Sequence, residues 1–330
     1  MTQSKLLGQG AYGCVYYPSY SCDGKEKDTL YVSKLTKNNK ASKNEYDIGK
    51  LVKKIPNYSK KFLIVEKRCK IKQPQVDAIK TGCNFIHKRS YPSYVLLYSR
   101  YLKSIELYDF LKEKKLSRLK FLEIIYSIYK RISELYSVGV IHMDLHFYNI
   151  LVSKKTEKLY VIDFGLSLDS NQFFKGDHIN LSYIEKNWFM KRPFSPSWTL
   201  EYIFISLMVK ENEELNKINI LETIREYYDY NKVIYTYLDT DYIQNTYEYY
   251  KSLEYNSRET NIKLLLQYTN TWDYYKLAYH ILNYMNSLIV FDELKWLLLL
   301  MMHPIPSFRP TKDELQEHFN NYLELIKNKE

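Results

Sequence analysis

One stretch of the sequence, residues 141–165, limits what this chain can fold into more than any other. Three polar side chains, Asp144, Asn149 and Asp163, lie there among apolar runs with the composition of short buried strands. A carboxylate at the end of a buried strand costs free energy unless another group pairs with it. Two carboxylates and an amide that one turn brings together supply the oxygen ligands that Mg²⁺ prefers. The stretch therefore predicts a turn that binds a metal ion.

The spacing of these residues follows a family pattern. The sequence His-x-Asp-x4-Asn runs from His142 to Asn149, and Asp-Phe-Gly begins 14 residues after that asparagine, at Asp163. In this order, the two motifs resemble the catalytic and metal-binding loops of protein kinases. The resemblance implies that Asp144 orients a substrate hydroxyl and accepts its proton. It also implies that Asn149 and Asp163 hold Mg²⁺ beside ATP.

A glycine-rich segment lies close to residue 1 and has the Gly-x-Gly-x-x-Gly spacing. Glycine lets backbone amides approach phosphate oxygens because it has no Cβ atom. Dinucleotide-binding folds share this spacing, but Val15 and the β-forming residues after it favour the kinase version of the loop. The resemblance then assigns a set of residues to ATP, with Tyr12 over the tip of the loop: Leu7, Gly8, Gly10, Tyr12, Gly13 and Val15.

A lysine interrupts the apolar strand expected over residues 29–35. Lys34 is either a solvated edge residue or a phosphate ligand, and the resemblance favours the ligand, since kinases carry their nucleotide lysine on such a strand. Residues 45–54 have helical apolar spacing, with Glu45 near the start. The resemblance makes Glu45 the partner of Lys34; the alternative is a solvated helical glutamate.

The strand expected over 94–101 leads into a segment, 98–103, that the resemblance assigns to the hinge beside the adenine ring. Glu106 follows the hinge and either bonds the ribose or caps the next helix. The basic, aromatic stretch 67–89 carries no readable chemistry. An amphipathic helix is expected over 119–139, where it would support the catalytic loop.

The second half of the chain follows the family less closely. Residues 166–194 correspond to the activation segment, and Ser195-Pro196-Ser197 is the nearest approach to the usual Ala-Pro-Glu. Residues from about 197 to 270 read as an atypical, tyrosine-rich insert, and their apolar spacing predicts helices. Its tyrosines are interpreted as packing residues.

Two further motifs that resemble the family occur towards the end of the chain. Asp273 begins a run that resembles the central helix of the kinase C-lobe, whose aspartate accepts amide hydrogens from the catalytic loop. A rival alignment gives this role to Glu201. Arg309 lies in an Arg-Pro-Thr block that is typical of protein kinases, and its expected glutamate partner is not identifiable from the sequence.

Two residues of the catalytic loop depart from the family pattern. Met143 replaces the usual arginine, so the loop lacks the cation that senses an activation-loop phosphate. His146 replaces the lysine of serine/threonine kinases, and it remains able to donate one hydrogen bond to a phosphate.

The composition of the 330 residues permits a sizeable core, since 45% are hydrophobic. The net charge of +10 favours acidic partners, but the lysines are dispersed, so we expect no specific nucleic-acid site. The four cysteines show no CxxC spacing, and residues 1–10 contain no signal peptide. The longest apolar run, 296–302, is too short to span a bilayer. These features predict a cytoplasmic protein.

We expect an α+β, bilobal protein kinase fold over residues 1–330, with a β-rich N-lobe (1–103) and a helical C-lobe (104–330). The expected activity is transfer of the ATP γ-phosphoryl group to serine or threonine hydroxyls of a protein of unknown identity. The departures and the abundance of residues with AT-rich codons resemble protein kinases of large nucleocytoplasmic DNA viruses, which would place the protein in the host cytoplasm or the virion. The alternatives are an inactive scaffold of the same fold and a small-molecule kinase.

Overall fold

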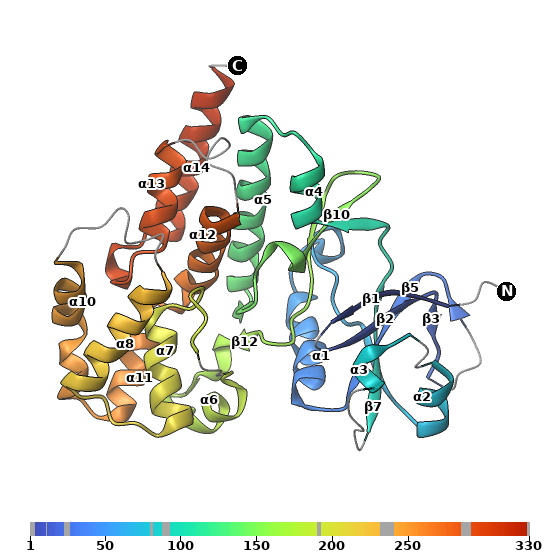
Figure 1. The fold of residues 1–330 in the computed structure, drawn as a ribbon, viewed down its shortest axis with the longest axis horizontal. Helices are drawn as coiled ribbons and strands as arrows, with labels where there is room; N and C mark the ends of the chain where they lie inside the picture. The colour runs from blue at the N-terminus through green and yellow to red at the C-terminus, as the bar shows by residue number, and fades with distance from the viewer. Residues whose placement is uncertain are drawn as a thin grey trace. The chain divides into compact units, whose positions relative to one another are not determined.

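The computed structural model describes residues 4–10, 12–22, 27–79, 82–87, 93–189, 193–231, 241–284 and 292–328 (Figure 1). The chain forms two compact units. The first unit comprises Met1–Phe110 and Tyr148–Ser167, and the second comprises Leu111–Phe147 and Leu168–Glu330. One unit is rich in strands and the other is mainly helical, as expected for the α+β class. Residues 148–167 join the β-rich unit, although the sequence assigned everything after residue 103 to the other lobe.

The first unit is built on a five-stranded antiparallel sheet in the order β1-β2-β5-β7-β6. The strands are β1 (Lys5–Gly10), β2 (Gly13–Tyr17), β5 (Tyr31–Lys37), β6 (Lys67–Ile71) and β7 (Tyr94–Arg100). Side chains alternate between the two faces of a strand. Cys14, Leu35 and Leu96 accordingly belong to one buried cluster, while their neighbours Lys34 and Leu97 line the other face.

Helix α1 (Lys40–Val52) begins at Asn39, whose side chain accepts the Ser42 N–H in a capping box. Its Tyr46 packs against Val95 and Leu97 of the sheet. The remaining elements of this part are short: β3 (Ser19–Tyr20), β4 (Lys27–Asp28), α2 (Gln73–Ile79) and α3 (Asn84–His87). Helix α4 (Leu107–Glu113) runs from the first unit into the second.

A second, three-stranded sheet completes the first unit. It has the order β11-β10-β8, with β8 (Ser104–Glu106), β10 (Ile150–Ser153) and β11 (Leu159–Val161). Ile150 pairs with Val161 at one end of the β10–β11 hairpin. Asn149 therefore immediately precedes the hairpin and Asp163 follows it at the same end.

Two disulfides cross-link the first unit. Cys14 of β2 is bonded to Cys83, and Cys22 is bonded to Cys69 of β6. Cys69 and Cys83 belong to the stretch 67–89, which the sequence left without a role, and the Cys14–Cys83 bond ties that stretch to the glycine-rich strand β2. The cytoplasmic location expected above rested on the cysteine spacing and on the absence of a signal peptide in residues 1–10, whereas disulfides are rare in cytosolic proteins.

The second unit is formed mainly by helices. They are α5 (Arg118–Tyr136), α6 (Leu181–Asn187), α7 (Leu200–Ser206), α8 (Lys217–Tyr230), α10 (Tyr242–Tyr250), α11 (Arg258–Leu266), α12 (Trp272–Tyr284), α13 (Asp292–Met301) and α14 (Lys312–Lys327). Two small two-stranded sheets join β9 (Val140–Ile141) to β12 (Leu168–Asp169) and β13 (Phe174–Lys175) to β14 (His178–Ile179). Within the described part of the chain, no helix is long and apolar enough to cross a membrane.

The tyrosine-rich range 197–270 contains α7, α8, α10 and α11, so it is helical as expected, apart from 232–240, which lie outside the described residues. Several of its tyrosines are buried, and their hydroxyls find partners inside the unit. The Tyr228 hydroxyl is hydrogen-bonded to the Thr246 hydroxyl, and the Tyr250 hydroxyl donates a hydrogen bond to the carbonyl oxygen of Pro304. These rings serve as packing residues, in line with the sequence interpretation.

Candidate active site

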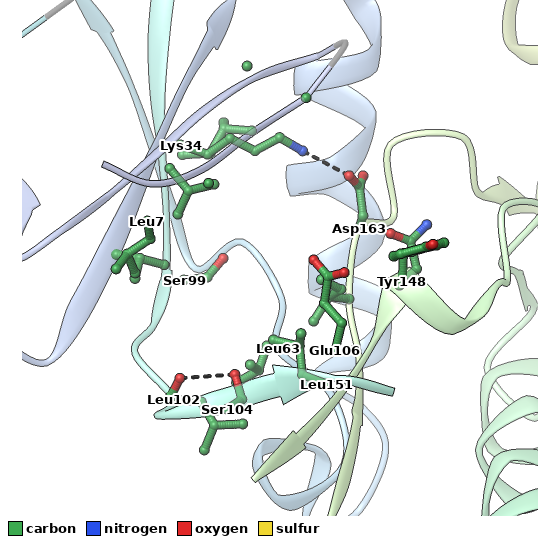
Figure 2. A pocket seen from close by; sticks show the side chains of 18 of the residues that line it. Leu7, Lys34, Leu63, Ser99, Leu102, Ser104, Glu106, Tyr148, Leu151 and Asp163 are labelled. Atoms are coloured by element: carbon green, nitrogen blue, oxygen red, sulfur yellow. Dashed lines mark hydrogen bonds and ion pairs between the residues drawn. The ribbon is translucent and has the colours of Figure 1, made fainter. Parts of the chain in front are cut away.

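Lys34 lies at the centre of a charged cluster in the first unit. It is held in β5 between Val15 of β2 and Leu97 of β7. Its Nζ atom is 3.1 Å from Glu45 Oε2 and 3.1 Å from Asp163 Oδ2, and Figure 2 shows the ammonium directed at the Asp163 carboxylate. The structure therefore brings together the lysine, glutamate and aspartate that the sequence singled out. Glu45 is buried, not a solvated helical residue.

The charges of this cluster do not cancel, because two carboxylates share one ammonium. Burial acts to lower the pKa of Lys34, but the charges of Glu45 and Asp163 outweigh it and raise that pKa. Burial also raises the pKa of Glu45 to about 7, and the Lys34 charge offsets only part of that rise. Two carboxyl groups thus compete for one ammonium, and a bound cation would favour the charged form of both.

A cavity of about 400 Å³ lies beside the cluster and is lined by all three glycines of the loop (Figure 2). A Cβ atom added to Gly8 or Gly10 would meet no atom within 4 Å, so these residues border open space. Gly13 has φ +154°, and a Cβ atom there would lie 2.4 Å from the Leu35 carbonyl oxygen. Only glycine fits that position without displacing the neighbouring strand.

The rest of the cavity wall is largely apolar and comes from several parts of the first unit. The expected hinge contributes residues 99–102, and Glu106 and Tyr148 also line the wall. Burial, and then the charge of Asp109, raises the pKa of Glu106. The apolar lining consists of Leu7, Val15, Val32, Leu63, Leu97, Leu102, Leu151 and Ile162. Tyr12 also borders the cavity and is 53% exposed. Such a pocket suits a flat heterocycle with a polar tail.

Asn149 and Asp163 provide oxygen atoms at the polar end of the cavity. The backbone holds them together, since the Ile162 N–H donates to the Asn149 carbonyl oxygen at 3.0 Å. Asp163 has a left-handed backbone with φ 60°, and its Oδ1 atom accepts the Gly165 N–H. A non-glycine residue in this conformation costs of order 1–3 kcal/mol, and such strain clusters at functional sites.

The second unit contains the loop that carries Asp144. Both carboxylate oxygens of the buried Asp273 accept backbone hydrogens from this loop: Oδ2 from His142 N–H at 2.7 Å and Oδ1 from Met143 N–H at 2.9 Å. Burial raises the pKa of Asp273. Of the two residues that the sequence left open for this role, the structure gives it to Asp273.

Asp144 itself is partly exposed within the second unit. Its Oδ2 atom is 3.9 Å from His146 Nε2, and its backbone N–H donates to His142 Nδ1 at 3.3 Å. Met143, at the position where the family carries an arginine, is 5% exposed and has φ 64°. Its apolar side chain is therefore buried next to the aspartate in the sequence, and it has no positive charge with which to bind a phosphate.

Glu201 has a different task from the one the rival alignment gave it. Its Oε1 and Oε2 atoms accept hydrogen bonds from Arg309 Nη1 and Nη2, at 2.7 and 3.0 Å. Both side chains are buried, with exposed fractions of 0% and 1%. This bidentate pair ties α7 to the Arg-Pro-Thr block and identifies the partner of Arg309 that the sequence did not reveal.

One charged residue near Asp144 was missed by sequence reasoning. Lys276 lies on α12, one turn after Asp273, and is 4% exposed. The only available signal was its position, because residues three apart lie on the same face of a helix. In an otherwise apolar, aromatic run this signal is weak.

A scan of the sequence against protein-family models identifies one for residues 1–319, described as "Protein kinase domain". The matched range spans both units and includes Lys34, Asp144, Asn149, Asp163 and Arg309. A comparison with curated proteins finds none that matches significantly.

Proposed function

The chain belongs to the protein kinase domain family, and we propose on that premise that it transfers the γ-phosphoryl group of Mg·ATP to serine or threonine hydroxyls of a protein. The observation that carries the proposal is the Lys34–Glu45–Asp163 cluster at the edge of a glycine-lined cavity. Phosphoryl transfer needs positioning and neutralisation of charge more than covalent chemistry from the protein. The cluster would position the phosphates through Lys34 and would neutralise their charge together with a bound Mg²⁺.

The residues of the first unit would bind the nucleotide. Open space beside Gly8 and Gly10 would let phosphate oxygens approach the backbone of the loop. Lys34 would bind the α- and β-phosphates while Glu45 holds its ammonium in place. The apolar wall and the segment 99–102 would receive the adenine ring, and Glu106 would contact the ribose.

The donor set beside Lys34 fits Mg²⁺. Asn149 and Asp163 offer hard oxygen ligands, and the two carboxyl groups of Glu45 and Asp163 share one ammonium. Mg²⁺ held there would supply positive charge to the phosphates during transfer. Asp163 would hold the ion with one carboxylate, and its left-handed backbone would orient that group.

Asp144 would orient the acceptor hydroxyl and accept its proton. The two hydrogen bonds from His142 and Met143 to the buried Asp273 support this by fixing the backbone just before it. Fixed geometry is what general base catalysis requires first. His146 would donate a hydrogen bond to the transferred phosphate.

Incubation of the full chain with γ-labelled ATP and a mixture of acceptors tests the proposed function directly. We expect label on serine or threonine of protein acceptors, mapped by mass spectrometry. Label on small molecules alone would indicate a small-molecule kinase. Binding of ATP without any transfer would indicate a scaffold of the same fold, and label on tyrosine would overturn the serine/threonine assignment.

Replacing Glu45 by Gln is expected to lower kcat/KM for ATP by about 10- to 100-fold, because a charge-assisted hydrogen bond contributes about 1.5–3 kcal/mol. Lys34 would keep Asp163 as its only charged partner in the cluster. Asp47→Asn on the same helix is the matched control, since Asp47 pairs with surface lysines and should change the value less than about twofold. Equal effects of the two substitutions would contradict the role of Glu45.

Replacing Asp163 by Ala is expected to remove the dependence of ATP binding on Mg²⁺. Calorimetric titrations of ATP with Mg²⁺ and with EDTA measure this dependence. We expect the wild type to bind at least about tenfold more tightly with Mg²⁺, a difference of about 1.4 kcal/mol, and the variant to bind equally under both conditions. A variant that keeps the wild-type difference would show that Asp163 does not hold the ion.

A further inference from the structure

Lys276 is a buried charge in the second unit to which the proposed chemistry gives no task. Its Nζ atom donates a hydrogen bond to Ser197 Oγ at 3.0 Å, and both residues are buried. An ammonium withdrawn from water is destabilised unless hydrogen bonds and opposite charges compensate it. One neutral hydroxyl is weak compensation for a full positive charge.

Two carboxylates supply the rest of the compensation. Burial lowers the pKa of Lys276 to about 8, and the charges of Asp144 and Asp273 oppose that fall. Asp273 already accepts two backbone hydrogens from the catalytic loop. Asp144 follows directly on the two backbone N–H groups that Asp273 holds, and it is the group at which the proposed chemistry takes place.

One neighbouring imidazole, that of His280, carries no positive charge. His280, one turn beyond Lys276 on α12, has its pKa lowered to about 3 by burial, with further lowering by Lys276 and His146. It is therefore neutral at physiological pH. The His146 Nε2 atom lies 3.9 Å from Asp144 Oδ2 and pairs with that carboxylate as an ion only when the imidazole is protonated.

We propose that Lys276 is a positioning residue for Asp144: held by Ser197, it places a fixed positive charge next to the catalytic carboxylate from α12. The proposal rests on the proposed function and adds a regulation of that site by pH. It also gives a task to Ser195-Pro196-Ser197, where the sequence lacks the usual Ala-Pro-Glu. The hydroxyl of Ser197 fixes the ammonium, and the Trp198 ring, whose centroid is 6.0 Å from Nζ, covers it.

The groups that face Lys276 define the expected pH dependence. They are Asp144 and His146 of the catalytic loop, Asp273 and His280 of α12, and the uncharged Ser197. A lysine whose pKa is near 8 is charged below that pH and neutral above it. The turnover of the wild type should therefore fall as the pH rises through about 8.

The test uses the full chain and compares Lys276→Met with Lys263→Met, an exposed lysine on α11. We expect Lys276→Met to lower kcat at least about thirtyfold, as for other groups that act on proton transfer, with the affinity for Mg·ATP within about threefold. The control should change kcat less than about twofold. An unchanged kcat in Lys276→Met overturns the proposal.

A purely structural role would also lower kcat, so the pH profile is the deciding readout. We expect Lys276→Met to lose the alkaline fall near pH 8. Ser197→Ala should move the fall to lower pH by about half a unit or more, since it removes a hydrogen bond to the charged form. Lys276→Arg should move it above pH 10 and restore part of kcat. Profiles with the same alkaline fall in all variants overturn the proposal.

A measurement without turnover separates this proposal from the proposed function. The ¹³Cε signal of Lys276 in lysine-labelled protein, assigned from its absence in Lys276→Met, reports its pKa directly. Asp144→Asn should lower that pKa by about one unit, because it removes the neighbouring negative charge. An unchanged pKa overturns the pairing even in an active enzyme. A lowered pKa in a chain that transfers no phosphate upholds the pairing and overturns the function.

Discussion

Replacing Asp144 by Asn should lower kcat for protein phosphorylation about 10³-fold, within the range that general base catalysis contributes. The amide cannot accept the proton of the substrate hydroxyl, while the backbone of the loop stays bound to Asp273. The affinity for Mg·ATP should remain within about twofold, because the residues that line the nucleotide cavity are untouched. Single-turnover kinetics with labelled ATP, together with calorimetric binding, measure both quantities.

Asp229→Asn is a suitable control for this substitution, since Asp229 is an exposed residue of α8. It should leave kcat within about twofold of the wild type. If Asp144→Asn retains turnover within about threefold, or 0.65 kcal/mol of barrier, the assignment of Asp144 is wrong. A parallel loss of ATP affinity would instead indicate that the substitution disturbs the fold.

Replacing Glu201 by Gln should lower the free energy of unfolding by about 3–5 kcal/mol, because it leaves the buried Arg309 guanidinium without its carboxylate. The Glu201 charge raises the pKa of Arg309 despite burial, so the arginine cannot escape by losing its proton. Urea unfolding followed by far-UV circular dichroism measures the change. The double variant Glu201→Leu/Arg309→Met should recover part of the loss, since it removes both buried charges.

The surface pair Arg258–Glu185 of the same unit is the matched control for the buried one. Its atoms are 3.3 Å apart, but its side chains are 36% and 49% exposed. Glu185→Gln should therefore change the free energy of unfolding by less than about 1 kcal/mol. A similar small change in Glu201→Gln would show that the Arg309 guanidinium reaches water when its partner is removed.

The first-unit site could be predicted from sequence because short patterns specify it. Lys34 alternates with Leu35 along one strand, so the strand pattern alone places it on the face opposite the core. Gly13 is required by a backbone conformation that other residues rarely adopt. Asn149 and Asp163 flank one hairpin, so this local structure alone brings the two residues close together in space.

The second-unit contacts could not be predicted in the same way, because they join residues that are far apart in sequence. Glu201 and Arg309 are 108 residues apart, and Lys276 and Ser197 are 79 apart. A lysine in an apolar helix could face solvent or core, and only the packing of α12 decides which. The edge strand β6 was missed because its lysines and arginine resemble a loop, although charged residues are common on exposed strands.

The first unit is discontinuous in the chain, and this has a consequence for the order in which the protein can form. Cys14, Cys83 and Lys34 have all left the ribosome before Asn149, the first of the two proposed metal ligands, is synthesised. The loops that the two disulfides close span 69 and 47 residues, and both lie entirely within this early part. A nascent chain can thus complete its cross-links while the β10–β11 hairpin does not yet exist. The strands of the five-stranded sheet and the hairpin that flanks the proposed metal site are therefore synthesised at different times, set apart by the translation of residues 111–147.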